Sequence, residues 1–252
     1  MPNPELARQR NTHLVLAELK TACANCNLRE LCFPAGLSVE DLDQIESLVQ
    51  VRRRVPRGET LYRSGDALDS LYAIRSGFFK TTIVYEDGRD QIIGFSMMGE
   101  ILGMDGISEG THHCDAIALE DSSVCAIPFV HLEALAHQVS GLQHNFTKLM
   151  SREIARESSI MMLLGVMHAQ ERVAAFLLNL SQRLAARGYS PVDFHLRMTR
   201  EEIGSYLGLK LETVSRAFSK FQADGLIEVN QKHVRIQNLV GLQSVYAHHV
   251  SE

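Results

Sequence analysis

Three cysteines near the N-terminus lie close enough together to put three thiolates on one loop. Cys23, Cys26 and Cys32 fall within ten residues, and Cys114 and Cys125 follow far downstream. Three thiolates on a loop and a fourth from elsewhere complete a site of four cysteine ligands, which holds either an iron–sulfur cluster or zinc. Zinc sites more often use two closely spaced cysteine pairs, and the sequence has only one such pair, so the spacing favours an iron–sulfur cluster modestly.

The spacing does not decide which distant cysteine would be the fourth ligand. Cys114 follows His112 and His113, and histidines also bind metals. Cys125 lies in the apolar segment 123–128, where an inert buried thiol is the simpler interpretation. From the residues alone, both cysteines are candidates.

A second group of side chains, in the C-terminal third, has the chemistry to read DNA bases. Glu212, Ser215 and Arg216 are spaced i, i+3 and i+4, so one exposed helix face would carry all three. Arginine can bind guanine through two hydrogen bonds, glutamate can accept one from cytosine, and serine suits several base edges. Alone, the three would be ordinary surface residues, so their surroundings decide the interpretation.

The surrounding sequence predicts a winged helix-turn-helix. Thr199 and Glu202 have the spacing of a capping box, and Gly208 suits the left-handed end of the short helix that follows. A second helix is expected from about residue 211 to 224, and residues 226–236 indicate a β-hairpin wing. The three polar residues then lie near the start of a recognition helix, which favours DNA reading.

The residues that precede this motif fall into two regions of different composition. From about residue 51 to 128, glycines and other turn residues recur every 6–12 residues, which is typical of an antiparallel barrel or sandwich. From about residue 141 to 188, helix formers dominate. Charge is also uneven: residues 1–168 carry a net −7 and residues 169–252 a net +2, which is compatible with a DNA-binding C-terminal part.

The helical stretch carries a stripe with coiled-coil spacing. Its members step by three and four residues: Thr147, Met150, Ile154, Glu157, Met161, Leu164 and His168. Such a stripe usually packs on its own domain. A buried core seldom holds a carboxylate, however, and Glu157 lies inside the stripe, so we interpret it as a dimer seam. Two facing carboxylates would keep that dimer close to dissociation.

Composition excludes several classes of protein. The 252 residues carry a net charge of −5, with 45% hydrophobic and 22% charged residues, as in a globular protein of one or two domains. The longest apolar run, residues 160–167, is far shorter than the roughly 18 residues of a membrane span. The N-terminus lacks the apolar core of a secretory signal, and five cysteines is an odd number. We expect a cytoplasmic protein with no membrane partner.

The order of these elements resembles a known family. A glycine-punctuated β-roll, a long helix and a winged helix-turn-helix with Glu-x-x-Ser-Arg are similar to the cyclic AMP receptor protein/FNR superfamily of bacterial transcription regulators. The Cys-x2-Cys-x5-Cys motif with a distant cysteine resembles its FNR type (fumarate and nitrate reduction regulator, and its Anr relatives). The resemblance covers about residues 23–239, and the stretches 71–77 and 198–209 make it specific.

The resemblance implies a fold and its division along the chain. The fold would be α+β, with a cluster-binding segment and short helices at residues 1–50 and a cupin-like β-roll sensor domain at 51–140. A dimerisation helix at 141–168 and a winged helix-turn-helix DNA-binding domain at 169–252 would follow.

The resemblance also implies roles for particular residues. It places the ligands of a 4Fe–4S cluster on Cys23, Cys26, Cys32 and Cys125. It places the DNA-reading residues on Glu212, Ser215 and Arg216, and the dimer helix on Ile154, Glu157 and Met161. Lys210 departs from the Thr or Ser that many relatives have as the cap of the recognition helix.

Members of this branch control anaerobic genes. Without oxygen they dimerise and bind palindromic promoter sites of TTGAT type. Oxygen converts the cluster to 2Fe–2S, the dimer weakens and DNA is released. Their exposed β-roll loops contact RNA polymerase, and residues 85–90 are the matching candidate here.

Two rival functions have sequence support that we weigh as weaker. The Gly-Glu-x-x-Gly motif of cyclic-nucleotide receptors is present at residues 99–103, but residues 111–118 contain no arginine to hold a phosphate, so we expect no cyclic nucleotide. Gly106-Ile-Ser108-Glu-Gly110 matches a nucleophile elbow, which needs a parallel α/β sheet. We predict a chance match in a loop, and no enzyme.

Overall fold

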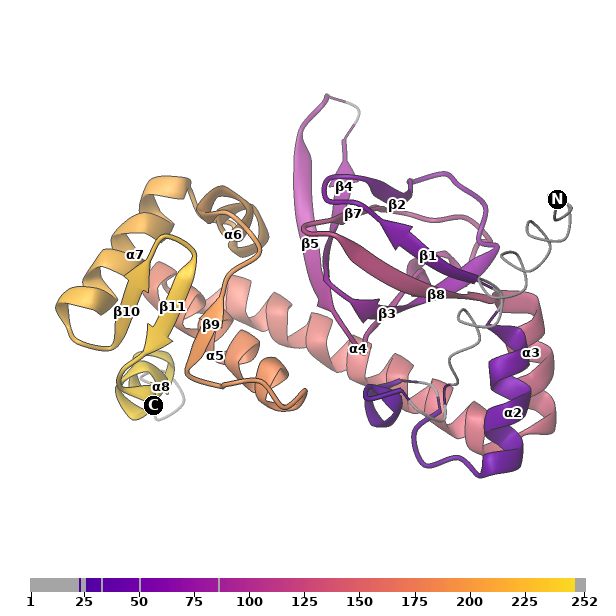
Figure 1. Cartoon of the computed structure of the whole chain (residues 1–252). Helices are drawn as coiled ribbons and strands as arrows, with labels where there is room; N and C mark the ends of the chain where they lie inside the picture. The colour runs from indigo at the N-terminus through magenta and orange to yellow at the C-terminus, as the bar shows by residue number, and fades with distance from the viewer. Residues whose placement is uncertain (1–22, 24–25, 33, 50, 86, 248–252) are drawn as a thin grey trace, which may run out of the picture. The chain divides into compact units, whose positions relative to one another are not determined.

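The computed structural model describes residues 23, 26–32, 34–49, 51–85 and 87–247 (Figure 1). The chain divides into two compact units. The first unit comprises residues 1–79 and 95–150, and the second comprises residues 80–94 and 151–252. The long helix α4 (Ser140–Val166) contributes its first residues to the first unit and the rest to the second.

Two β-sheets have the strand orders β1-β8-β3-β6 and β2-β7-β4-β5 (Figure 1). They belong to the first unit except for residues 80–94 of the β4–β5 hairpin, which count with the second unit. The pairings β1·β8, β3·β8, β3·β6 and β2·β7 are antiparallel. The strands are β1 (Val51–Val55), β2 (Thr60–Tyr62), β3 (Ser70–Ser76), β4 (Phe78–Val84), β5 (Asp90–Met97), β6 (Ile101–Leu102), β7 (Asp115–Ala118) and β8 (Ser122–Pro128). This is the glycine-punctuated antiparallel architecture that the turn spacing predicted.

Helices pack on the face of β3 and β8 that carries Leu71, Ala73 and Ile127. These helices are η2 (Arg29–Leu31), α2 (Val39–Leu48), α3 (Phe129–Gln138) and the first turns of α4. The resulting core also contains Leu42 and Leu142. A further 3-10 turn, η3 (Met104–Gly106), follows β6. The N-terminal segment and the start of α4 therefore share one hydrophobic core.

Within the described ranges, the second unit contains four helices after α4 and a small sheet. The elements are α5 (Ala169–Ala185), β9 (Asp193–His195), α6 (Arg200–Leu207), α7 (Leu211–Ala223), β10 (Ile227–Asn230), β11 (His233–Ile236) and α8 (Leu239–Ala247). The strand order is β10-β11-β9, with both pairings antiparallel. The predicted hairpin is β10–β11, and β9 adds a third strand that the sequence did not predict.

Local sequence accounts for the helix-turn-helix. The Thr199 hydroxyl accepts a hydrogen bond from the Glu202 N–H (3.1 Å), and the Glu202 carboxylate accepts one from the Thr199 N–H (2.7 Å), as the capping box predicted. Gly208 ends α6 at φ +63°. Gly204 permits the tight turn, because a Cβ there would lie 2.6 Å from the Leu209 carbonyl oxygen.

The predicted long helix differs from the observed one at its end. α4 stops at Val166, and His168 precedes α5, where its N–H donates to the Glu171 carboxylate (2.7 Å). The last position of the coiled-coil stripe therefore lies outside the helix. No helix in the described ranges is both long enough and apolar enough to cross a membrane.

Candidate cluster-binding and DNA-binding sites

One cavity of the first unit is lined by four of the five cysteines: Cys23, Cys26, Cys32 and Cys125. Cys125 lies on β8, where it pairs in register with Ala73 of β3. Side chains alternate along a strand, so Cys125 and the fully buried Val124 point to opposite faces of the sheet. The other three cysteines come from the N-terminal segment that covers the face of Cys125. The fifth cysteine, Cys114, does not line this cavity.

The N-terminal segment winds in successive three-residue turns. The Cys26 N–H donates to the Cys23 carbonyl (3.2 Å), the Arg29 N–H to the Cys26 carbonyl (3.0 Å) and the Cys32 N–H to the Arg29 carbonyl (3.2 Å). In such turns residues three apart lie on the same side. This winding explains how three cysteines on a short segment reach one cavity.

Close packing holds this segment against the rest of the unit. Gly99 has φ +85°, and a Cβ there would lie 3.0 Å from the Leu31 Cβ. A Cβ on Gly141 of α4 would lie 2.6 Å from Leu37. The Asn145 side-chain amide, also on α4, donates to the Ala35 carbonyl (2.7 Å). The segment that carries the cysteines is thus in direct contact with the beginning of α4.

Burial makes the thiols of Cys23 and Cys125 weaker acids. It raises the pKa of Cys23 to about 11, and the nearby Cys125 adds to the shift. Burial also raises the pKa of Cys125, against the opposing effect of the Arg75 guanidinium. Metal binding must therefore displace protons from these thiols, which couples metal uptake to pH.

The donor set fits an iron–sulfur cluster. Four cysteines line a mostly apolar cavity together with Arg29 and Arg75, and a cluster with four thiolate ligands is an anionic group that nearby cations would stabilise. Within the described ranges, no three His, Cys, Asp or Glu side chains converge as they would around a single metal ion. A four-iron cluster instead takes one thiolate at each corner, so its ligands surround a volume.

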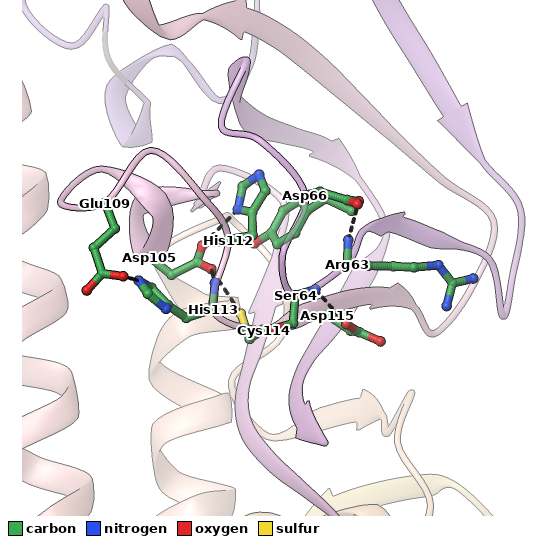
Figure 2. A network of polar contacts seen from close by, with 10 residues as sticks. Arg63, Ser64, Asp66, Asp105, Glu109, His112, His113, Cys114 and Asp115 are labelled. Atoms are coloured by element: carbon green, nitrogen blue, oxygen red, sulfur yellow. Dashed lines mark hydrogen bonds and ion pairs between the residues drawn. The ribbon is translucent and has the colours of Figure 1, made fainter. Parts of the chain in front are cut away.

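The alternative ligand, Cys114, belongs to a separate polar network centred on Asp105 (Figure 2). Its thiol donates to one Asp105 oxygen (3.4 Å), which also accepts from the His113 N–H (2.8 Å). The other oxygen lies 3.4 Å from both the Tyr62 hydroxyl and His112 Nδ1. The Tyr62 and His112 rings stack with centroids 3.7 Å apart. The network accounts for the buried polar groups of this loop without a metal.

The predicted base-reading residues lie on the recognition helix α7. Glu212 and Arg216 are exposed and Ser215 is half-buried, and within the described residues their side chains make no hydrogen bond or ion pair. The opposite face of α7 is buried through Val214, Phe218 and Phe221. This exposed face of α7 is therefore available to a ligand.

The start of α7 lacks a side-chain cap. Lys210 is the N-cap residue, and its side chain makes no capping hydrogen bond. An ammonium group has no lone pair to accept the free N–H groups of a first helical turn. The departure from the usual cap residue thus leaves these donors to solvent or to a ligand.

The predicted dimer stripe is partly exposed on α4. Ile154 and Met161 are 61% and 67% exposed, and Glu157 between them is also exposed. Met150 and Leu164 are half-buried. The exposed apolar surface continues to Met162 and Val166, which the three-and-four spacing did not include.

Comparison with known proteins agrees with this arrangement. The family model of the Crp-like helix-turn-helix domain matches residues 171–245, and that of the cyclic nucleotide-binding domain matches residues 52–139. The chain is 48% identical over 223 residues to the transcriptional regulatory protein btr of Bordetella pertussis, covering 88% of this chain and 92% of that relative. It is 42% identical over 226 residues to the fumarate and nitrate reduction regulatory protein of Escherichia coli K12, covering 90% of each.

A solved structure shows the same arrangement of elements. FixK2 from Bradyrhizobium japonicum matches with a TM-score of 0.72 and 29% identity, covering 77% of this chain and 96% of that one. A β-roll of the nucleotide-binding type, followed by a winged helix-turn-helix, defines a DNA-binding transcription regulator. The chain belongs to the Crp/FNR superfamily of transcription regulators, whose members bind DNA and act as dimers.

These findings confirm the family resemblance and the α+β fold that the motifs predicted. They also agree with the expectation that the chain is not an enzyme, because its relatives are transcription regulators. Ser108 of the elbow-like motif lies in a turn after η3 and does not connect a strand to a helix.

Alkylation tests the raised pKa of Cys23. At pH 8, the native apo-protein should react with iodoacetamide at Cys23 ~100 times more slowly than the same protein in urea, because the raised pKa lowers the thiolate fraction by that factor. The native rate should keep rising as the pH approaches the pKa of about 11. Peptide mass spectrometry after timed quenching measures both rates. Equal rates with and without urea at pH 8 would show that the thiol is not desolvated.

Replacing the N-cap residue tests the missing cap. Lys210→Thr should raise the unfolding free energy of the second unit by about 1 kcal/mol, because a hydroxyl can accept a first-turn N–H. Lys210→Ala removes the same charge without supplying a cap, and it should give no stabilisation. Urea denaturation followed by circular dichroism measures the difference. Equal stability of the two variants would mean that α7 does not depend on its cap.

Proposed function

We propose that this protein is an oxygen-sensing transcription regulator, a cytoplasmic homodimer that holds a 4Fe–4S cluster on Cys23, Cys26, Cys32 and Cys125. The observation that carries the proposal is the single cavity lined by these four thiols. The relatives named for fumarate and nitrate reduction add to it, since 42% identity extends over 90% of the chain. When bound, the cluster would supply chemistry that responds to oxygen.

The position of the cavity supports a link to dimerisation. Cys23, Cys32 and Cys125 pack against the same hydrophobic core as Leu142 and Phe146 of α4. Because packed interiors change shape by discrete rearrangement, a change of volume in the cavity bears directly on these turns of α4. The same helix carries the exposed Ile154–Met161 stripe.

Glu157 supports a weak, adjustable dimer. It is exposed between two large exposed apolar residues, so a second copy of α4 that buried the stripe would bring two carboxylates together. Repulsion and desolvation of these groups oppose association, while burial of Ile154 and Met161 favours it. A modest shift in the packing of α4 then changes the dimer population greatly, since about 1.4 kcal/mol alters an equilibrium tenfold.

The exposed face of α7 supports sequence-specific DNA binding. In a dimer, two recognition helices would present Glu212, Ser215 and Arg216 to successive major grooves, about 34 Å apart on the duplex. The TTGAT-type palindrome is the site that we propose, with RNA polymerase contacting the exposed β-roll loop. Val84 and Tyr85 of that loop are more than half exposed, and residue 86 lies outside the described ranges.

The Asp105 network argues against a cyclic nucleotide as effector. It follows the Gly-Glu-x-x-Gly motif, and its centre is a carboxylate with a buried histidine and tyrosine around it (Figure 2). A nucleotide phosphate would meet negative charge there instead of an arginine. We therefore propose regulation by the cysteine cavity and not by a nucleotide.

Anaerobic reconstitution tests the proposed function. Loading with iron and sulfide should give about four iron and four sulfide ions per chain, a shift from monomer to dimer, and binding to a TTGAT palindrome. Exposure to air should reverse all three results. Cys125→Ala should lose the cluster, whereas Cys114→Ala, which alters the cysteine outside the cavity, should keep it. A Cys125→Ala protein with a full complement of iron would exclude the proposed ligand set.

A single substitution in the stripe tests the proposed dimer seam. Glu157→Ala should strengthen self-association in air by about tenfold or more, because it removes a pair of facing carboxylates. Glu133→Ala removes an exposed carboxylate from α3 and serves as the control. Sedimentation velocity across a concentration series measures the dissociation constants. If both variants behave as the parent does, Glu157 has no part in the interface.

A further inference from the structure

Arg29 shares the periodicity of the three N-terminal cysteines. The segment reads Cys23-x2-Cys26-x2-Arg29-x2-Cys32, and backbone hydrogen bonds close a three-residue turn at each of these steps. Residues three apart lie above one another in such turns. The winding that carries the cysteines to the cavity therefore carries Arg29 with them, and Arg29 lines the same cavity.

The guanidinium of Arg29 has one satisfied end and one unsatisfied nitrogen. Nη2 donates to the Leu37 carbonyl oxygen (2.8 Å). Nε is buried and has no hydrogen-bond acceptor among the described residues. The carboxylate of Glu30 lies 3.8 Å from Nε, beyond hydrogen-bond distance, and its side chain is 75% exposed. A buried N–H without an acceptor is unfavourable by roughly the desolvation of that group, and the described residues supply no hydrogen-bond acceptor for this donor.

We propose that Arg29 is a positioning residue for the cluster, and that its Nε–H is the hydrogen-bond donor to a sulfur atom held in the cavity. The inference rests on the proposed function. Sulfur atoms of clusters and of their cysteine ligands accept such bonds, and these bonds together with local charge set the reduction potential. A fixed cation also offsets the negative charge that four thiolates bring into an apolar cavity.

The hydrogen bond from Arg29 Nη2 to Leu37 connects the cavity with α4. Leu37, whose carbonyl accepts from Nη2, packs against Gly141 at a distance that leaves no room for a Cβ. The Arg29 side chain thus links the cavity wall to Leu37, which contacts the first turn of α4. Arginine suits this position because its planar fork can donate in two directions at once, which a lysine ammonium on a flexible stem does less well.

Arg75 has a different relation to the cavity. It lines the wall from β3 and lowers the pKa of Cys125 through its charge, against the larger effect of burial. Arg75 thus acts on the ligand from the sheet side, whereas Arg29 moves with the segment that carries three ligands. The proposal therefore concerns Arg29 alone.

The test compares Arg29→Gln, Arg29→Lys and Glu30→Gln with the parent after anaerobic loading of the full-length protein with iron and sulfide. The midpoint potential is measured by redox titration, and loss of the cluster in air by its visible absorbance. Arg29→Gln should lower the potential and lose the cluster about tenfold faster, the scale of one hydrogen bond to a charged acceptor. Arg29→Lys keeps the charge and should fall between Arg29→Gln and the parent.

Glu30→Gln is the matched control, because it changes the neighbouring exposed charge and leaves the guanidinium in place. It should match the parent in both measurements. Arg29→Gln with unchanged potential and decay, or Glu30→Gln with an equal effect, would overturn the role of Arg29. Circular dichroism of the apo-protein shows whether Arg29→Gln folds. If it does not, Arg29→Lys decides: a decay rate and a potential equal to those of the parent would overturn the role of Arg29. A parent protein that takes up no iron and sulfide would overturn both this inference and the proposed function.

Discussion

Four thiols share one cavity only because the N-terminal segment packs against the outward face of β3 and β8. That face supplies Cys125 from the middle of a sheet, where its backbone is fixed on both sides by β1 and β3. The other three thiols come from a segment with little regular structure of its own. Its position depends on contacts with Gly99 and Gly141, where a larger residue would push it away. The remaining features of the site follow from this packing.

Burial of the thiols has an electrostatic consequence as well as a geometric one. Desolvation raises the pKa of Cys23 and Cys125, so both thiols favour the neutral form. The proposed cluster requires thiolates, and the two arginines in the wall are the groups that can offset their charge. The Asp105 carboxylate differs from these thiols, since protein donors satisfy it: the His113 N–H, the Cys114 thiol and the Tyr62 hydroxyl of β2. This difference separates Cys125 from Cys114 more clearly than their positions along the chain do.

The hydrophobic core of the first unit connects the cysteine cavity with α4, the helix that carries the proposed dimer seam. Leu142 of α4 lies in the cluster of buried residues against which Cys23, Cys32 and Cys125 pack. An apolar core transmits a change of packing because it is close-packed and has few voids. The exposed stripe around Glu157 lies further along this helix, where burial of apolar area and repulsion of charge oppose each other. A balance of this kind is what the proposed oxygen response requires.

Structural elements that depend on interactions within a few residues could be predicted from the sequence. The capping box at Thr199, the glycine at 208 and the apolar face of α7 establish the helix-turn-helix, because each acts within a few residues. The turn spacing likewise predicted an antiparallel barrel or sandwich, and the close spacing of Cys23, Cys26 and Cys32 predicted that they share one site. Features that depend on distant contacts became visible only in the folded chain. Folding brought Cys125 rather than Cys114 to the cavity, added β9 to the wing and ended α4 before His168. It also buried Arg29 Nε where none of the described residues accepts its hydrogen bond. Each of these outcomes depends on which segments pack together, and spacing along the chain does not contain that information.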